Sequence, residues 1–184
     1  MKAIVITKYG PPDVLELKEV DKPVPRDFEV LVKVHAASLT FSNLFLVSGK
    51  PFPLRLMFGL LKPRLSIPGS DIAGRVEAVG GKVRKFRPGD EVFGDLSNCG
   101  RGGFAEYVSV PESELGLKPA NSSFAEAAAV PEAALVALQG LRDKGRIQKG
   151  QKVLICGASG GIGTFAVQIA KYFGAEVTGV CGAT

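Results

Sequence analysis

The most constraining feature of this sequence is the segment 152–180, where a glycine-rich turn separates two apolar runs. Residues 152–156 are typical of a fully buried strand in a parallel sheet. An amphipathic helix is expected over 163–173, closed by Gly174, and a second strand follows over 176–180. A strand, a helix and a strand in this order form a βαβ unit, whose crossover is right-handed in nearly all proteins. The sequence therefore predicts the start of an α/β domain.

The turn in this segment has the spacing of a dinucleotide-binding fingerprint. Its pattern is A-x-G-x-x-G through Ala158, Gly160 and Gly163, placed after a strand and before a helix as such a site requires. Gly160 would let the backbone approach a pyrophosphate, and Gly163 would let the helix pack close to the strand. A merely structural turn is the alternative, and the flanking elements favour the nucleotide site. The predicted cofactor-binding residues are Ala158, Ser159, Gly160, Gly161, Ile162, Gly163 and, near the adenosine ribose, Thr184.

The end of the second strand indicates which nicotinamide cofactor is preferred. An NAD site usually has a carboxylate there, which holds the ribose 2′-hydroxyl. Residues 181–184 contain no Asp or Glu, so the 2′-phosphate of NADPH would meet no negative charge. We therefore expect NADPH rather than NADH. Lys171 or a basic residue after Thr184 could contact the 2′-phosphate.

The first 120 residues have a different pattern, with short alternating or β-branched runs broken by Gly and Pro. Strands are expected over 3–7, 14–20, 30–35, 74–79, 91–94 and 105–111. Many short strands at this spacing predict a closed or nearly closed β-barrel. Helices follow over 125–129, capped by Ser122 or Ser123, and over 132–142. The predicted domains are a barrel over 1–120, and connecting helices with an incomplete nucleotide-binding domain over 121–184.

Charge and cysteine content exclude several other classes of protein. The net charge of +5 comes from scattered basic residues, so no nucleic-acid partner is expected. Three separated cysteines without a CxxC pair are typical of a reducing compartment. The N-terminus has a strand pattern rather than that of a signal peptide, and no apolar run approaches the roughly 20 residues that span a bilayer. We expect a cytoplasmic protein without a membrane partner.

Candidate metal ligands are few and scattered. His35 is the single histidine and lies in a strand pattern, while Cys99 lies in a glycine-rich loop with no other soft ligand near it in sequence. A zinc site needs several converging Cys, His or carboxylate ligands. The sequence therefore predicts no metal.

Four segments together resemble the quinone oxidoreductase-like, zinc-independent branch of the medium-chain dehydrogenase/reductase superfamily. They are the opening MKAIVITKYGPPDVLEL, the pair 67–80 and 86–94, the run 102–108, and the helix-rich stretch 127–141. The resemblance covers essentially the whole chain. It implies a GroES-like barrel followed by a Rossmann domain. Zinc-binding relatives have Gly-His-Glu where this chain has Gly69-Ser-Asp71, so Ser70 replaces a ligand histidine.

The resemblance also implies a function, in which a hydride passes from NADPH to a quinone or an α,β-unsaturated carbonyl without zinc. Many relatives have Asn-Pro-x-Asp near the nicotinamide, and the matching run here is Thr40-Phe-Ser-Asn43. Thr40 and Asn43 are therefore the candidate catalytic residues, and they can exchange hydrogen bonds but not act as carboxylates. A threonine common in relatives is Val136 here, which removes one possible hydroxyl contact to the cofactor. A homodimer is implied for the full-length protein.

Two further expectations concern the extent of the chain and rival functions. In the resembling family the Rossmann domain continues for several strands, so the 184 residues alone are expected to be inactive, and the segment after residue 151 to be poorly stable. A zinc-free alcohol dehydrogenase-like enzyme is one alternative. A non-catalytic nucleotide-binding protein of the same fold is the other.

Overall fold

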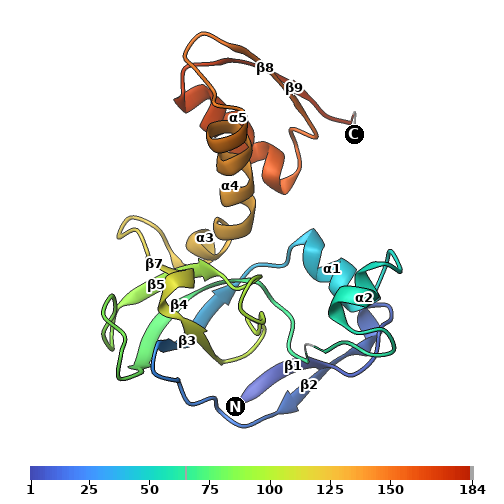
Figure 1. Cartoon of the computed structure of the whole chain (residues 1–184), viewed down its shortest axis with the longest axis vertical. Coiled ribbons are helices and arrows are strands. Elements are labelled where there is room, and N and C mark those ends of the chain that lie inside the picture. Colours follow the sequence, from blue (N-terminus) through green and yellow to red (C-terminus); the bar gives the residue numbers. More distant parts are fainter. Residues whose placement is uncertain (65, 183–184) are drawn as a thin grey trace. The chain divides into compact units, whose positions relative to one another are not determined.

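The computed structural model describes residues 1–64 and 66–182, which divide into two compact units (Figure 1). The first unit is residues 1–129 and the second is residues 130–184, of which 130–182 are described. The sequence places the domain boundary after residue 120, whereas the backbone contacts group the short helix of residues 124–128 with the first unit. Each unit has its own hydrophobic core and is described separately below.

The first unit contains two antiparallel sheets. Strands β1 (Lys2–Ile6) and β2 (Leu15–Glu19) pair with each other. The second sheet has five strands in the order β6-β3-β4-β5-β7. Its strands are β3 (Glu29–Ala37), β4 (Asp71–Val79), β5 (Glu91–Asp95), β6 (Tyr107–Pro111) and β7 (Leu115–Leu117). Ala3 forms a single bridge with Ala105, which links the two sheets beside β6.

The main core of the first unit consists of the inward-facing residues of the larger sheet. Alternation of side chains along each strand puts one set of apolar residues on the same face. The buried cluster consists of Val30, Val32, Ile72, Val76, Val83, Phe86, Val92, Leu96, Val108, Val110 and Leu115. This core confirms the predicted barrel-type first domain. Among the described residues β6 and β7 remain the edges of the sheet, so strand pairing does not close the ring.

Short helices connect and flank these strands. They are η1 (Pro12–Val14), α1 (Phe41–Ser48), α2 (Leu54–Phe58), η2 (Glu112–Glu114) and α3 (Phe124–Ala128). Ser123 caps α3, as one of the two predicted capping residues. Helices α1 and α2 and strand β7 were not predicted, because none of them is long enough to repeat its pattern clearly.

The second unit contains α4 (Pro131–Leu138), the π-helical turn η3 (Gln139–Lys144), β8 (Lys152–Cys156), α5 (Gly161–Tyr172) and β9 (Glu176–Val180). Strands β8 and β9 are parallel, and α5 connects them, so the βαβ prediction is confirmed. Pro131 begins α4, at a position where the missing N–H costs nothing. The predicted single helix over 132–142 is instead α-helical to Leu138 and π-helical afterwards.

The sheet of the second unit is covered less than the sequence suggests. Ala137, Ile147, Ile155, Ala166 and Ala170 form its buried core. Within β8 only Ile155 is buried, and Leu154 is 64% exposed. The prediction of a fully buried strand is therefore wrong for this chain, because β8 has a single strand neighbour and helical cover on one face.

Candidate cofactor and substrate sites

The glycine turn joins β8 to α5 through a tight backbone. Gly157 has a φ of 74°, which only glycine adopts readily, and the N–H groups of Gly157 and Ala158 both donate to the carbonyl of Val180 at 2.8 and 3.0 Å. The N–H of Gly160 donates back to the carbonyl of Gly157 at 3.0 Å. The turn is therefore fixed to the end of β9, which follows from the parallel pairing of the two strands.

Gly163 makes the close helix–strand approach that the fingerprint predicts. A Cβ at this position would lie 2.0 Å from the carbonyl oxygen of Gly157 and 2.8 Å from the Cα of Ala158. Because both neighbours are backbone atoms, neither can move aside easily. Gly179 on β9 has a related constraint, since its Cβ would lie 2.9 Å from that of Ala158. The sequence analysis missed the roles of Gly157 and Gly179, because both depend on contacts between the turn and β9.

The predicted phosphate-binding residues surround the start of α5. Ser159, Gly160 and Gly161 are exposed, Ala158 is half-buried, and Ile162 is 47% exposed. Gly160 precedes the first helical turn, where the backbone N–H groups have no partner within the helix. A Cβ added at Gly161 would have no neighbouring atom within 4 Å. An exposed helix N-terminus with open space around Gly161 fits a phosphate group.

The residues after β9 are partly described. Cys181 and Gly182 are exposed, and neither offers a carboxylate to a ribose. Thr184, the predicted ribose neighbour, lies outside the described residues. Lys171, one of the two predicted sources of positive charge for a 2′-phosphate, is exposed near the end of α5.

Thr40 and Asn43 lie together at the start of α1. Thr40 is the N-cap residue of α1, and its backbone N–H donates to the side-chain oxygen of Asn43 at 3.0 Å. The Thr40 hydroxyl lies 2.7 Å from that of Ser42. Asn43 is 1% exposed, and its side-chain nitrogen is buried without a hydrogen-bond partner. A buried amide donor without an acceptor is unusual in folded proteins.

Ser70 directly precedes β4, Asp71 begins it, and both are fully buried. They are 0% and 1% exposed, in the segment where zinc-binding relatives of the resembling family have Gly-His-Glu. The Ser38 hydroxyl donates to the Asp71 carboxylate at 3.0 Å, and the Ser38 N–H donates to the Asp71 carbonyl at 3.1 Å. Asp71 therefore fixes the position of Ser38, which directly follows β3 and lies two residues before Thr40. The buried acid positions this segment, a role that the sequence analysis did not assign.

His35 and Cys99 are engaged in contacts of their own. The His35 ring stacks on Phe124 with centroids 4.4 Å apart, and its Nδ1 lies 3.0 Å from the carbonyl of Lys33. Burial, together with the carboxylates of Glu114 and Asp95, raises the pKa of the Cys99 thiol to about 11. Across the described ranges, no three His, Cys, Asp or Glu side chains gather as metal ligands would.

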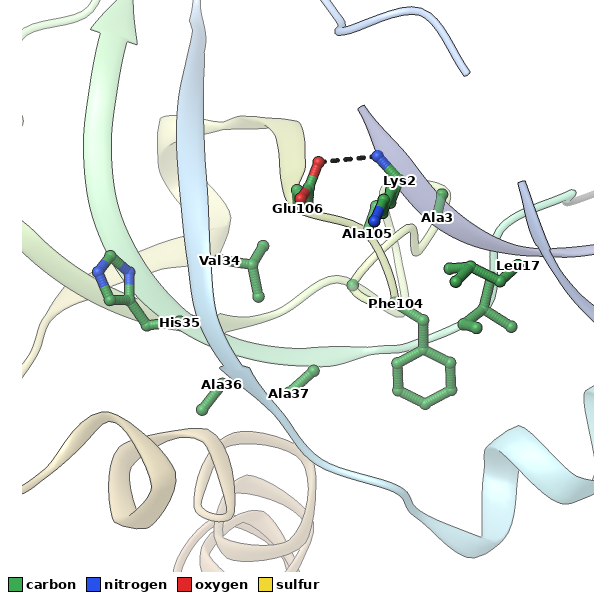
Figure 2. Close-up of a pocket in the computed structure, with 12 residues that line it drawn as sticks. Lys2, Ala3, Leu17, Val34, His35, Ala36, Ala37, Phe104, Ala105 and Glu106 are labelled. Carbon is green, nitrogen blue, oxygen red and sulfur yellow. Dashed lines mark hydrogen bonds between the residues drawn. The ribbon is translucent and has the colours of Figure 1, made fainter. Parts of the chain in front are cut away.

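A shallow groove of about 330 Å³ lies in the first unit, between β1, β3 and the segment 103–106. Figure 2 shows Phe104, Leu17 and Val34 among its lining residues, with the backbone N–H of Lys2 bonded to the Glu106 carboxylate at 2.8 Å. Thr40 and Asn43 do not line this groove. The groove and the predicted catalytic pair are therefore distinct features of the first unit.

Comparisons with known proteins relate this chain to one family of oxidoreductases. The family model for the alcohol dehydrogenase GroES-like domain matches residues 26–140. Human quinone oxidoreductase is 35% identical over 99% of this chain and 53% of its own length. The 2-methylene-furan-3-one reductase of Solanum lycopersicum is 37% identical over the whole chain and 48% of its own length. The chain thus spans about half the length of these curated relatives.

The chain is also similar to solved structures of this family. CurK enoyl reductase superposes with a TM-score of 0.89 at 31% identity, over 98% of this chain and 54% of its own. Escherichia coli quinone oxidoreductase, solved in complex with NADPH, gives a TM-score of 0.84 at 29% identity, over 97% of this chain and 52% of its own. None of the helices in the described part of the chain has the length and apolar content needed to cross a membrane.

Proposed function

Because this chain belongs to the quinone oxidoreductase-like branch of the medium-chain dehydrogenase/reductase superfamily, we propose that its full-length protein is an NADPH-dependent reductase of quinones or α,β-unsaturated carbonyls. The oxidoreductase class follows from the relatives, which are quinone oxidoreductases and enoyl reductases. The cofactor, the acceptor class and the independence from zinc are our proposals.

The observation that carries the proposal is the glycine turn. Gly163 brings the backbone of α5 against the carbonyl of Gly157, and the exposed first turn of α5 offers N–H donors beside open space. The proposed pyrophosphate contacts come from Ser159, Gly160, Gly161 and Ile162, with Ala158 and Gly163 shaping the turn. A loop that served only to connect two elements would not need this close approach and this exposed helix end together.

The choice of NADPH rests on charge at the end of β9. A carboxylate there would repel a 2′-phosphate, and residues 181–184 contain none. Lys171 is exposed and available as a cation, although a residue from the rest of the protein could serve instead. The complex of the Escherichia coli relative with NADPH supports the same choice.

The proposed chemistry requires little of the protein beyond positioning. When bound, the cofactor supplies the hydride. Thr40 and Asn43 are proposed to face the nicotinamide, where the unpartnered side-chain N–H of Asn43 would donate to an oxygen of the cofactor or acceptor. A proton from solvent would complete the reduction. Ser70 occupies the position of the ligand histidine in zinc-binding relatives, so the proposed mechanism contains no metal-bound intermediate.

An assay of the full-length protein tests this function. We expect NADPH oxidation with members of a panel of quinones and enones, and weaker activity with NADH. Alcohol-dependent reduction of NADP⁺ without quinone or enone turnover would instead indicate an alcohol dehydrogenase-like enzyme. NADPH binding without turnover of any acceptor would indicate a non-catalytic nucleotide-binding protein.

Two features of the full-length protein complete the proposal. We propose a homodimer, as the resemblance implies, and a cytoplasmic location, which the three unpaired cysteines support. Light scattering after size exclusion and cell fractionation measure these two features directly. A monomer, or enrichment of the protein in an organelle, would contradict the respective proposal.

A further inference from the structure

Unsatisfied polar groups are concentrated in one loop of the first unit. Among the described residues, four buried side-chain nitrogen or oxygen atoms have no hydrogen-bond partner. One is the Asn43 amide nitrogen discussed above. The other three are the Ser97 hydroxyl oxygen and the Nε and Nη1 atoms of Arg101, all in the loop between β5 and β6. Buried groups of this kind are rare in folded proteins, so their clustering requires an explanation.

The backbone of this loop is bent to hold Arg101 in place. The carbonyl of Leu96 accepts from the N–H groups of both Cys99 and Arg101, at 3.1 and 3.0 Å. Gly100, Arg101 and Gly102 all have positive φ, at 107°, 64° and 106°. A side chain with a Cβ is disfavoured in this conformation, which glycine adopts easily. Arg101 therefore occupies a strained position between two glycines, and such positions are concentrated at functional sites.

Arg101 has no compensating anion among the described residues. It forms none of the ion pairs found there, whereas Arg75 pairs with Glu91 at 2.7 Å. The ring of Phe58 lies beside Arg101, with its centroid 5.9 Å from the guanidinium carbon. That distance is at the outer limit of a cation–π contact. Burying a guanidinium without giving it a hydrogen-bond acceptor is energetically costly.

The loop is attached to the same segment as the proposed catalytic residues. The N–H of Leu96 donates to the carbonyl of Ser70 at 2.8 Å, and the N–H of Gly103 donates to that of Gly69 at 2.9 Å. On the other side of this segment, Asp71 binds Ser38, two residues before Thr40. Segment 69–71 thus joins the loop carrying Ser97 and Arg101 to the chain leading into α1.

We propose that Ser97 and Arg101 bind a carboxylate group of the electron acceptor. The unpartnered groups comprise guanidinium N–H donors and one hydroxyl, and the natural ligand of such a set is an anionic oxygen group. This assignment rests on the proposed function and narrows it, because it makes the preferred acceptor a quinone or enone that carries a carboxylate. Because Arg101 is only half-buried, a carboxylate could reach it from solvent if the loop moved slightly outward.

Binding is the first test, because it needs no turnover. Thermal unfolding of the full-length protein with NADPH would be followed with 4-oxopent-2-enoate and with its methyl ester, two enones that differ in charge. We expect the acid to raise the midpoint more than the ester in the parent protein. Arg101→Met should remove this difference, and Arg101→Lys should retain part of it. Arg84→Met, which removes an exposed arginine, is the matched control for lost charge and should preserve the difference.

Kinetics with the same two enones is the second test. We expect Arg101→Met to lower the acid-to-ester ratio of kcat/KM by about 10-fold, mainly through KM, because one charge-assisted contact is lost. Ser97→Ala should lower the ratio less. Stabilisation by the acid without turnover of either enone, or of any quinone or enone in the panel, would retain the anion site but reject the proposed reductase function.

Two outcomes would overturn the assignment of a carboxylate site. One is a parent protein that does not distinguish the acid from the ester. The other is an Arg101→Met variant that unfolds at a lower temperature yet keeps the discrimination, which would assign Arg101 to an ion pair with an acidic residue elsewhere in the full-length protein.

Discussion

Gly163 is the residue whose side chain, or lack of one, most directly determines the geometry of the cofactor turn. Its Cβ would overlap the Gly157 carbonyl, and the overlap involves backbone on both sides. We expect Gly163→Ala to lower the unfolding midpoint of the full-length protein and to weaken NADPH binding. Gly140→Ala is the control, because a Cβ there meets nothing within 4 Å and alanine favours a helix by roughly 0.5–1 kcal/mol. Differential scanning calorimetry would measure the unfolding midpoints of both variants. Equal midpoints for Gly163→Ala and Gly140→Ala would contradict the packing role of Gly163.

Cys99 gives a second prediction at the scale of one residue. Its thiol pKa is raised to about 11, chiefly by burial, whereas Cys156 and Cys181 are exposed. The thiolate is the reactive form, so Cys99 should be alkylated by iodoacetamide at pH 8 far more slowly than the other two. Its rate should increase as the pH approaches 11 if the protein stays folded. Peptide mapping after timed alkylation measures this order, and fast labelling of Cys99 at pH 8 would refute it.

At the scale of an element, helix α3 depends on its N-terminal cap. The Ser123 hydroxyl accepts from the Glu126 N–H, while the Glu126 carboxylate accepts from the Ser123 N–H at 2.8 Å. Ser123→Ala should cost about 1 kcal/mol in urea unfolding at pH 7, since it leaves an N–H of the first turn without its acceptor. Ser122→Ala is the neighbouring control, because Ser122 does not cap the helix. Equal losses in both variants would contradict the assignment of the cap.

The same cap gives a pH dependence with a definite sign. Hydrogen bonds from the Ser123 backbone N–H, then from its hydroxyl, lower the pKa of Glu126 below its ordinary value. A lowered pKa in the folded state means that this contribution is fully present above the unfolded pKa of about 4.3 and is lost as the pH falls through the folded value. The stability difference between the parent protein and Glu126→Gln should therefore shrink with acidification below that range. Urea titrations at several pH values measure this stability difference. A difference that stays constant with pH would contradict the prediction.

Elements also show where prediction from sequence is weakest. Four of the five strands of the larger sheet were predicted to within three residues of their observed bounds, because alternation of apolar residues is a local signal. Helices α1 and α2 lie in the stretch 41–58, which mixes apolar and basic residues without a clear period, and β7 has only three residues. Such short elements are stabilised by what they pack against rather than by their own propensity. Their positions could not be read from the local pattern.

At the scale of the whole molecule, cofactor binding should increase the free energy of unfolding. A ligand that binds only the folded state stabilises it by about 2.7 kcal/mol at 100 times its Kd. We expect NADPH to raise the unfolding midpoint of the full-length protein more than NADH at equal concentration, because residues 181–184 carry no acid that would repel the 2′-phosphate. A thermal scan with each nucleotide measures this preference. A larger shift with NADH would overturn the proposed cofactor.

The sequence by itself determined the class of each unit and the location of the glycine turn. Period-two alternation, the apolar run at β8 and the spacing of Gly160 and Gly163 are all local features, so they can be recognised without knowledge of the fold. Thr40 and Asn43 came from a resemblance, and their roles stay predictions.

Only the tertiary structure decided how distant segments meet. It fixed Gly157 against β9 and buried Asp71 beside Ser38. It also left the Ser97 hydroxyl and two guanidinium nitrogens of Arg101 without hydrogen-bond partners in one bent loop. Burial and hydrogen-bond satisfaction depend on contacts between residues far apart in the chain, and no local pattern records them. For that reason the turn was predictable, whereas the proposed carboxylate site was not.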